Sequence, residues 1–336
     1  MNHPIITLEE AWLSSHVREF YRANSLADPN AEDGLTGYAT APLMEFGAKR
    51  LGSMDQNGIR LQVVSHVPNP HPLEVEVASK VNDELHQLVK GMPDGRFAAF
   101  ATLPMKHPDA AATELKRCVQ ELGFLGTLVD SNCGGRFYDD AFFWPVFEAA
   151  TELDVPVYIH PCPNERVKQV LYAGNYPDHV ATSMSEYGWG WHNETAVHLM
   201  RLYAAGVFDR FPRLKIVLGH CGEMLPFQLD RTARVMERQW PHLGCKRERG
   251  FRQVWDENVW ITTSGMFSVA TMACVLRQCK KDRVMFSVDY PFGHNEEGVK
   301  FLSALKDEGL VDDEGLRRIA YKNAEALLGV KVGMEV

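Results

Sequence analysis

The chain lacks the features that mark secreted and membrane proteins. Its seven cysteines include no Cys-x-x-Cys pair, so neither a disulfide framework nor a zinc ribbon is expected, and a reducing compartment is favoured. No apolar run approaches the roughly 18 residues of a membrane span, and the acidic start MNHPIITLEEAWL does not resemble a signal peptide. We therefore expect a cytoplasmic protein that does not bind membranes.

Features of nucleic-acid-binding and multidomain proteins are missing as well. The formal net charge is −9 and no block of lysine and arginine stands out, so no nucleic-acid partner is expected. The 336 residues contain no internal repeat, low-complexity tract or Pro/Gly/Ser-rich linker. The sequence therefore predicts one catalytic domain that spans residues 1–336.

Short apolar runs alternate with helical segments along the whole sequence. The runs are rich in β-branched residues and do not alternate with polar ones, which is typical of parallel strands buried on both faces. Eight of them predict a single (β/α)8 barrel, since no Gly-x-Gly-x-x-Gly turn supports the alternative, a doubly wound open sheet. The predicted strands are Ile5–Leu8, Leu61–Ser65, Phe97–Thr102, Gly126–Val129, Val155–Ile159, Lys215–Leu218, Val259–Thr262 and Val284–Ser287.

Two segments are too long to be simple connections between barrel elements. Residues 13–42 precede the second strand–helix unit and residues 161–193 follow the fifth strand, both on the face where strands end. Long loops of this kind are usually lids or binding loops, so we expect them to border an active site. In the second, the aromatic stretch YGWGWHNE (Tyr187–Glu194) would suit a flat ring, although packing within the loop explains it equally well.

Polar residues follow six of the predicted strands. In β/α barrels the chemistry takes place at the carboxyl ends of the strands, so these side chains should meet in one place. A lone histidine there is usually a structural residue, and an aspartate can simply form a turn. A purely structural role would have to apply to every one of these residues at once, and we therefore favour a reaction centre. The residues are Glu9, Glu10, Ser65, His66, Asp130, His160, His220 and Asp289.

Three of these residues carry donors that a divalent cation accepts: Glu9, His160 and Asp289. Zn²⁺ binds histidine and carboxylate, whereas Mn²⁺ or Mg²⁺ would accept a set rich in oxygen. Three protein ligands leave coordination positions open, as in catalytic rather than structural sites. We expect one divalent metal ion, with Zn²⁺ as the first choice, and no organic cofactor.

Five motifs carry a resemblance to a known family. ITLEEAWL, VPVYIHP, IVLGHCGEMLPF, ENVWITTSGMFS and RVMFSVDYPF follow one another over nearly the whole chain. They resemble the metal-dependent aromatic acid decarboxylases of the amidohydrolase superfamily, most closely the 2,3-dihydroxybenzoate and salicylate members. The resemblance implies a homodimer or homotetramer that reversibly decarboxylates an aromatic carboxylic acid bearing an ortho-hydroxyl group.

The resemblance assigns Glu9, His160 and Asp289 as the metal ligands. Many members of the superfamily carry a His-x-His pair after the first strand, where this chain has Glu9, Glu10 and Ala11. Glu9 would then bind metal, whereas Ala11 cannot. This pattern agrees with the hydroxybenzoate branch of the family.

The resemblance also implies roles in catalysis and substrate binding. His220 matches the catalytic histidine, and Glu223, expected in the first turn of the next helix, matches the carboxylate that orients it. Arg231 matches an arginine that contacts the substrate carboxylate, in its own or a neighbouring subunit. Ser65 and Asp130 would also contact substrate. Asp130 stands where the dihydroxybenzoate decarboxylases carry asparagine, which counts against 2,3-dihydroxybenzoate itself.

In the expected reaction, Asp289 protonates the ring carbon that bears the carboxylate, and loss of CO₂ restores aromaticity. His220 would bind substrate and pass protons, while Cys221 is assigned to packing. Two other functions remain open. A metal-dependent hydrolase acting on a lactone or amide is one, although many use the missing His-x-His pair. A non-enzymatic binding protein is the other, although the intact ligand set counts against it.

Overall fold

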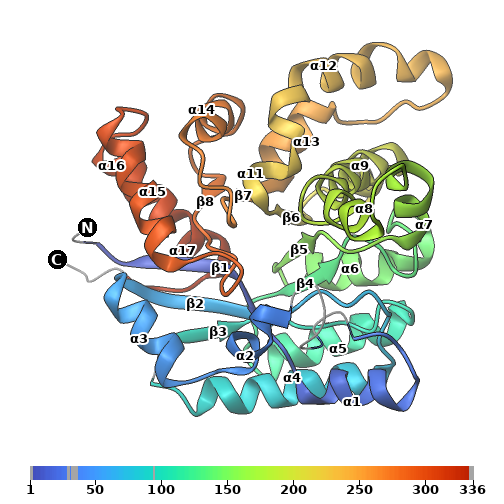
Figure 1. Ribbon diagram of the computed structural model, residues 1–336. Coiled ribbons are helices and arrows are strands. Elements are labelled where there is room, and N and C mark those ends of the chain that lie inside the picture. Colours follow the sequence, from blue (N-terminus) through green and yellow to red (C-terminus); the bar gives the residue numbers. More distant parts are fainter. Residues whose placement is uncertain (1–2, 29–30, 32–36, 94, 333–336) are drawn as a thin grey trace.

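The barrel strands form where the β-branched runs predict them. The computed structural model describes residues 3–28, 31, 37–93 and 95–332, in which strands and helices alternate along the chain (Figure 1). All the strand pairs are parallel. The strands are β1 (Ile5–Trp12), β2 (Ile59–His66), β3 (Phe97–Ala99), β4 (Thr127–Asp130), β5 (Pro156–His160), β6 (Lys215–Leu218), β7 (Val259–Thr262) and β8 (Val284–Met285).

The order of the strands in space follows the order of the chain. Strands β1–β2–β3 form one run and β4–β5–β6–β7–β8 another, and a parallel bridge between Ala101 and Thr127 joins the two. Between β8 and β1, the hydroxyl of Ser287 accepts hydrogen bonds from the amides of Leu8 and Glu9 at 3.0 and 2.7 Å. The strands therefore close into the predicted (β/α)8 barrel.

Helices connect the strands and surround the barrel (Figure 1). Up to β5 they are α1 (Ser15–Ala23), α2 (Gly37–Met44), α3 (Ala48–Gln56), α4 (Val75–Lys90), α5 (Pro108–Gln120), a 3-10 turn (Ala141–Phe143) and α6 (Trp144–Glu152). Between β5 and β7 they are α7 (Glu165–Val167), a π-helical turn (Lys168–Tyr172), α8 (Asp178–Ser185), α9 (Gly190–Ala205), α10 (Val207–Arg210), α11 (His220–Glu223), α12 (Leu225–Arg238), a 3-10 turn (Trp240–Leu243) and α13 (Phe251–Asn258). The remainder are α14 (Val269–Gln278), α15 (Asn295–Asp307), α16 (Asp313–Arg317), a π-helical turn (Arg318–Lys322) and α17 (Asn323–Leu328).

The two long segments contain helices of their own. Residues 13–42 include α1 and the start of α2, and part of this segment lies outside the described residues. Residues 161–193 include α7, α8 and the start of α9. Among the described helices, none combines the length and the apolar character needed to cross a membrane.

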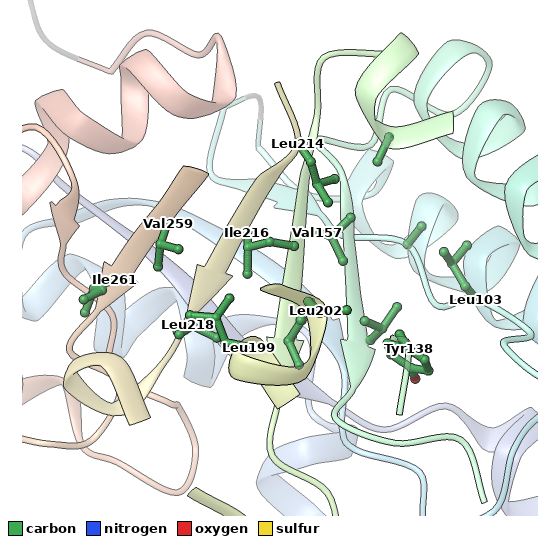
Figure 2. Close-up of a cluster of buried hydrophobic side chains, with 14 of the residues drawn as sticks. Leu103, Tyr138, Val157, Leu199, Leu202, Leu214, Ile216, Leu218, Val259 and Ile261 are labelled. Atoms are coloured by element: carbon green, nitrogen blue, oxygen red, sulfur yellow. The ribbon is translucent and has the colours of Figure 1, made fainter. Parts of the chain in front are cut away.

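Successive residues of each strand belong to two different hydrophobic layers. Ile216 and Leu218 of β6 lie in the outer cluster, which also contains residues of α9 (Figure 2). Val217 between them belongs to a second cluster with Tyr158 and Trp260, inside the barrel. Because side chains alternate between the faces of a strand and both faces are buried, the strand sequences show no polar alternation.

Strand β1 is longer than predicted, and this changes where two carboxylates lie. It extends to Trp12, so Glu9 and Glu10 belong to the strand rather than to the turn after it. Thr7 pairs with Gln62, and Glu10 pairs with Val64. Between these two pairs β1 advances by three residues, whereas β2 advances by only two. This irregularity is a β-bulge, a feature that re-aims side chains and is common beside active sites. Strands β3 and β8 are conversely shorter than predicted.

Candidate metal centre and substrate cavity

A cavity of about 290 Å³ lies at the carboxyl ends of the strands, where the sequence predicts the reaction centre. None of the described residues that line it is lysine or arginine, so an anionic ligand would meet carboxylates unless a cation stood between them. The polar part of the wall includes Glu9, His160, Glu186, His220 and Asp289. The apolar and aromatic part includes Val67, Leu128, Tyr187, Trp191 and Phe292.

Glu9 is fixed through one of its two carboxylate oxygens. Its Oε2 accepts hydrogen bonds from the hydroxyls of Tyr158 and Ser264. Gly219 permits this arrangement, because a Cβ at that position would stand 2.6 Å from Glu9 Oε2. The other oxygen, Oε1, is buried and has no hydrogen-bond partner among the described residues. Burial alone would raise the pKa of Glu9, but its contacts with His220, His160 and Ser264 hold it at about 2.

The imidazole of His160 presents a lone pair to that free oxygen. Its Nδ1 lies 2.6 Å from the carbonyl oxygen of Pro161, so the proton of the neutral ring sits on Nδ1. Its Nε2 lies 3.0 Å from Glu9 Oε1. Two acceptors at this distance require a cation, either a second proton on the ring or a metal ion. Glu9 likewise raises the pKa of His160 against the lowering effect of burial. The residues present therefore fit a divalent metal.

His220 and Asp289 stand beside this pair. His220 Nε2 lies 3.7 Å from Glu9 Oε1 and 3.8 Å from Asp289 Oδ2. The donor atoms of Glu9, His160 and His220 all lie within 4.8 Å of one another. Burial, reinforced by the charge of Glu9, raises the pKa of Asp289. The structure thus gathers the three predicted ligands around one cavity and adds His220 as a further donor. The ligand role of Asp289 stays a prediction.

The segment between β6 and α12 is wound left-handed. His220, Cys221, Gly222, Glu223 and Met224 have φ angles between 46° and 87°. For residues other than glycine this conformation costs roughly 1–2 kcal/mol each, and such strain is concentrated at functional sites. Glu223 lies in the first helical turn after β6, as predicted, but this turn, α11, is left-handed, and the longer helix α12 begins only at Leu225.

The left-handed turn places Glu223 directly against His220. Glu223 is fully buried, and its Oε1 lies 2.7 Å from His220 Nδ1. Burial alone would raise the pKa of Glu223, but its contacts with His220 and His192 hold it below its ordinary value. This is the geometry expected of a carboxylate that orients an imidazole, and the catalytic roles of both residues stay predictions.

His192 was not among the residues predicted from the sequence, although it contacts Glu223. It lies buried on α9, with Nδ1 2.7 Å from Glu223 Oε2 and its ring centroid 4.5 Å from that of His220. Its only signal was its place in the stretch Tyr187–Glu194. Trp191 and Tyr187 of that stretch do line the cavity, as a ring-binding loop would. Tyr158, in the motif VPVYIHP, was missed as well.

Ser65 and Asp130 lie in different places. Ser65 is buried near the end of β2 and lines the main cavity, as predicted. Asp130 ends β4 and lines a neighbouring cavity of about 30 Å³, which shares His66 with the main one. The backbone amide of Asn69 lies 3.2 Å from its Oδ1, and burial raises the pKa of Asp130 to about 7. Its contact with substrate stays a prediction that this conformation does not display.

Arg231 lies outside the cavity of its own chain. It is an exposed residue of α12 and lines an adjoining, mainly apolar groove with Met224, Phe227 and His220. Phe227 is 81% exposed there. The contact between Arg231 and a substrate carboxylate, in its own or a neighbouring subunit, stays a prediction.

Comparison with known proteins decides the family. The family model described as amidohydrolase matches residues 67–330. This chain belongs to the amidohydrolase family. It is 44% identical to the decarboxylase orsB of Emericella nidulans, and the alignment covers 100% of both chains.

Solved structures of related enzymes share its fold. A 2,6-dihydroxybenzoate decarboxylase in complex with 2,6-dihydroxybenzoate superposes with a TM-score of 0.83 and 29% identity, covering 97% of this chain and 98% of the other. A dihydroxybenzoic acid decarboxylase of Polaromonas sp. JS666, with bound manganese and the inhibitor 2-nitroresorcinol, gives a TM-score of 0.81 and 29% identity over 98% and 97%. The predicted family, barrel fold and enzyme class are confirmed, and the protein is a carboxy-lyase.

Proposed function

We propose that this protein reversibly decarboxylates an ortho-hydroxybenzoic acid at one divalent metal ion, in a single catalytic domain spanning residues 1–336 in the cytoplasm. Acids of the dihydroxybenzoate, salicylate, 6-methylsalicylate and orsellinate types are the candidates. The observation that carries the proposal is the meeting of two acceptors, Glu9 Oε1 and His160 Nε2, 3.0 Å apart beside Asp289. They face a cavity with flat, apolar walls, as a benzoic acid would require.

Glu9, His160 and Asp289 would hold the metal, with His220 adjacent to them. Zn²⁺ is our first choice for a mixed set of carboxylate and imidazole donors, and Mn²⁺ or Mg²⁺ are the alternatives. The Polaromonas relative contains manganese, which keeps Mn²⁺ in consideration. A bound ion would supply a fixed positive charge to a cavity whose described lining has neither lysine nor arginine, and it would orient the carboxylate and the neighbouring phenol oxygen of the substrate.

The protein's own residues then provide position and protons. Trp191, Phe292 and Leu128 offer apolar surface to the ring and displace water from it. Asp289, which lines the cavity beside His220, is our candidate for the acid that would place a proton on the ring carbon that bears the carboxylate. The carbon–carbon bond then breaks, its electron pair returns to the ring, and CO₂ leaves. His220 Nε2, 3.8 Å from Asp289 Oδ2, is placed to return a proton to it.

We further propose that the active form is a homodimer or homotetramer. The predicted contact of Arg231 with the substrate carboxylate would be made from the adjoining groove, in its own or a neighbouring subunit. In either arrangement the guanidinium would add a second cation to a cavity whose described lining has neither lysine nor arginine.

The test is a substrate panel with metal add-back. The metal-free protein would be incubated with Zn²⁺, Mn²⁺ or Mg²⁺ and with salicylate, 2,3- and 2,6-dihydroxybenzoate, 6-methylsalicylate, orsellinate and 5-carboxyvanillate, while CO₂ release is followed. Benzoate and 3-hydroxybenzoate, which lack the ortho-hydroxyl group, are the matched controls. We expect metal-dependent turnover of one or more ortho-hydroxy acids and none of the controls. Lactone hydrolysis without turnover of any aromatic acid would contradict the proposal in favour of a hydrolase.

A further inference from the structure

We propose that His192 is a second positioning residue of the site, which holds the Glu223 carboxylate through the oxygen that His220 does not contact, so that His220 keeps one orientation. The inference rests on the proposed function, which it deepens. Its basis is a chain of short contacts that leads from the cavity wall at Trp191, through His192 and Glu223, back to His220 in the same cavity.

The positions of the protons in this series of contacts follow from one donor, the indole N–H group of Trp191. The indole nitrogen of Trp191 can only donate, and it lies 3.1 Å from His192 Nε2. His192 Nε2 is therefore an acceptor, and the proton of the neutral ring sits on Nδ1, which donates to Glu223 Oε2 at 2.7 Å. A longer contact of 3.3 Å joins the same Nε2 to the carbonyl oxygen of Tyr187. That contact would need a proton on Nε2, which the closer indole donor opposes.

Each oxygen of Glu223 thus receives one imidazole N–H group. His220 Nδ1 donates to Oε1 at 2.7 Å, and His192 Nδ1 donates to Oε2 at 2.7 Å. Glu223 is fully buried, so an oxygen without a donor would be left without water to replace it. Held at both oxygens, the carboxylate has one plane, and that plane sets the direction in which His220 presents Nε2 to Asp289 and Glu9.

A second metal site in this trio is the competing explanation. His192, His220 and Glu223 carry donor atoms within 4.8 Å of one another. Both nitrogen–oxygen distances of 2.7 Å are, however, those of charge-assisted hydrogen bonds, with the proton between the two atoms. The lone pairs that a cation would need are therefore already used.

Matched variants at position 192 test the proposal through activity. An asparagine side chain places its amide donor near the position of Nδ1, whereas glutamine places it near Nε2. We expect kcat of His192→Ala to fall roughly 10–100-fold, the usual effect of losing such a supporting contact, with KM changed less than about threefold. His192→Asn should recover most of the loss and His192→Gln should not. Circular dichroism and metal content establish that each variant is folded and loaded.

A structural measurement keeps the inference separate from the proposed function. Imidazole N–H protons bonded to carboxylates give low-field proton NMR signals. We expect two such signals from the Glu223 pair in the wild type, loss of one and displacement of the other in His192→Ala, and retention of the His220 signal in His192→Asn. If the wild type decarboxylates no acid of the panel, the proposed function fails, and these signals alone decide the role of His192.

Two results would overturn the inference. The first is a folded His192→Ala variant whose kcat is within about threefold of the wild type. The second is a His220 signal that does not move when His192 is removed. If His192→Ala does not fold, the comparison of the asparagine and glutamine variants takes its place, and equal behaviour of those two would also contradict the inference.

Discussion

Helix α9 (Gly190–Ala205) carries two buried histidines that serve different regions of the molecule. His192 donates to the carboxylate of Glu223 at 2.7 Å and thereby contacts the reaction centre. His198, further along the same helix, accepts the backbone N–H of Tyr138 at 3.0 Å and packs edge-on against that ring. Burial lowers the pKa of His198 to about 3, so it stays neutral at physiological pH.

The difference shows that the partner of a buried histidine decides its role. His192 and His198 share the residue type and the helix, and both are buried. His192 contacts a carboxylate, Glu223, whose other partner His220 lies at the reaction centre. His198 contacts a backbone amide, that of Tyr138, which belongs to the fold alone. We therefore expect substitutions at the His192 end to change catalysis more than stability, and substitutions at the His198 end to do the reverse.

The strongest test of the catalytic end is Asp289→Asn. Asparagine keeps the shape of the side chain but has no acidic proton to place on the substrate. Because general acid catalysis contributes about 10²–10⁴-fold, we expect CO₂ release to fall by at least about 100-fold. The unfolding midpoint measured with the metal-free protein should change little, which separates lost chemistry from lost folding. A near-normal rate would rule out Asp289 as the proton donor.

His198→Ala tests the structural end. The change leaves the buried amide of Tyr138 without an acceptor and removes a ring packed against Phe137 and Tyr138. We expect the free energy of unfolding to fall by about 3 kcal/mol, with kcat per folded molecule unchanged. His198→Gln, whose carbonyl can accept the same hydrogen bond, should recover much of the loss. A large fall in kcat for folded His198→Ala would contradict the assignment of a purely structural role to His198.

The pH dependence of stability gives a second test of the structural role of His198. The pKa of His198 is about 3 in the folded protein and 6.5 for the model group, so the unfolded chain binds the proton more tightly. Its contribution to stability is therefore complete above about pH 6.5 and declines as the pH falls towards 3, by about 2 kcal/mol between roughly pH 7.5 and pH 5. Urea titrations of the wild type and His198→Gln at both pH values check this. The difference between the two proteins isolates His198 from the other titrating groups, and an unchanged difference would contradict the expectation.

Most of the barrel could be predicted because its strands are buried on both faces. The bounds of β6 and β7 agree with those expected, since both strands consist mainly of buried apolar residues. The end of β1 was placed too early because carboxylates normally avoid buried strands. Glu10 is tolerated there because Ser287 and the amides of Val288 and Tyr290 donate hydrogen bonds to it, and those donors come from the far end of the chain.

The same logic explains which site residues could be found. Glu9, His160, His220 and Asp289 lie at or near strand ends, so barrel geometry alone predicts that they meet. His192 could not be found in this way, since it comes from a helix and reaches the site only through the left-handed turn after β6. No spacing rule connects a helix residue to a turn of that kind.

The smallest expected effect is that of Cys221→Ala. This variant tests whether the function of a residue in this turn depends on its hydrogen-bond partner or on its closeness to His220. Cys221 is adjacent to His220 in sequence, but its buried thiol lies 3.6 Å from the carbonyl oxygen of Met266, and burial raises its pKa to about 12. A thiol that stays protonated is a poor nucleophile, and alanine leaves only a small cavity. We therefore expect kcat/KM within about twofold of the wild type and a loss of about 1 kcal/mol in the free energy of unfolding. Complete loss of activity in a folded variant would mean that proximity to His220, and not the bonded partner, decides function in this turn.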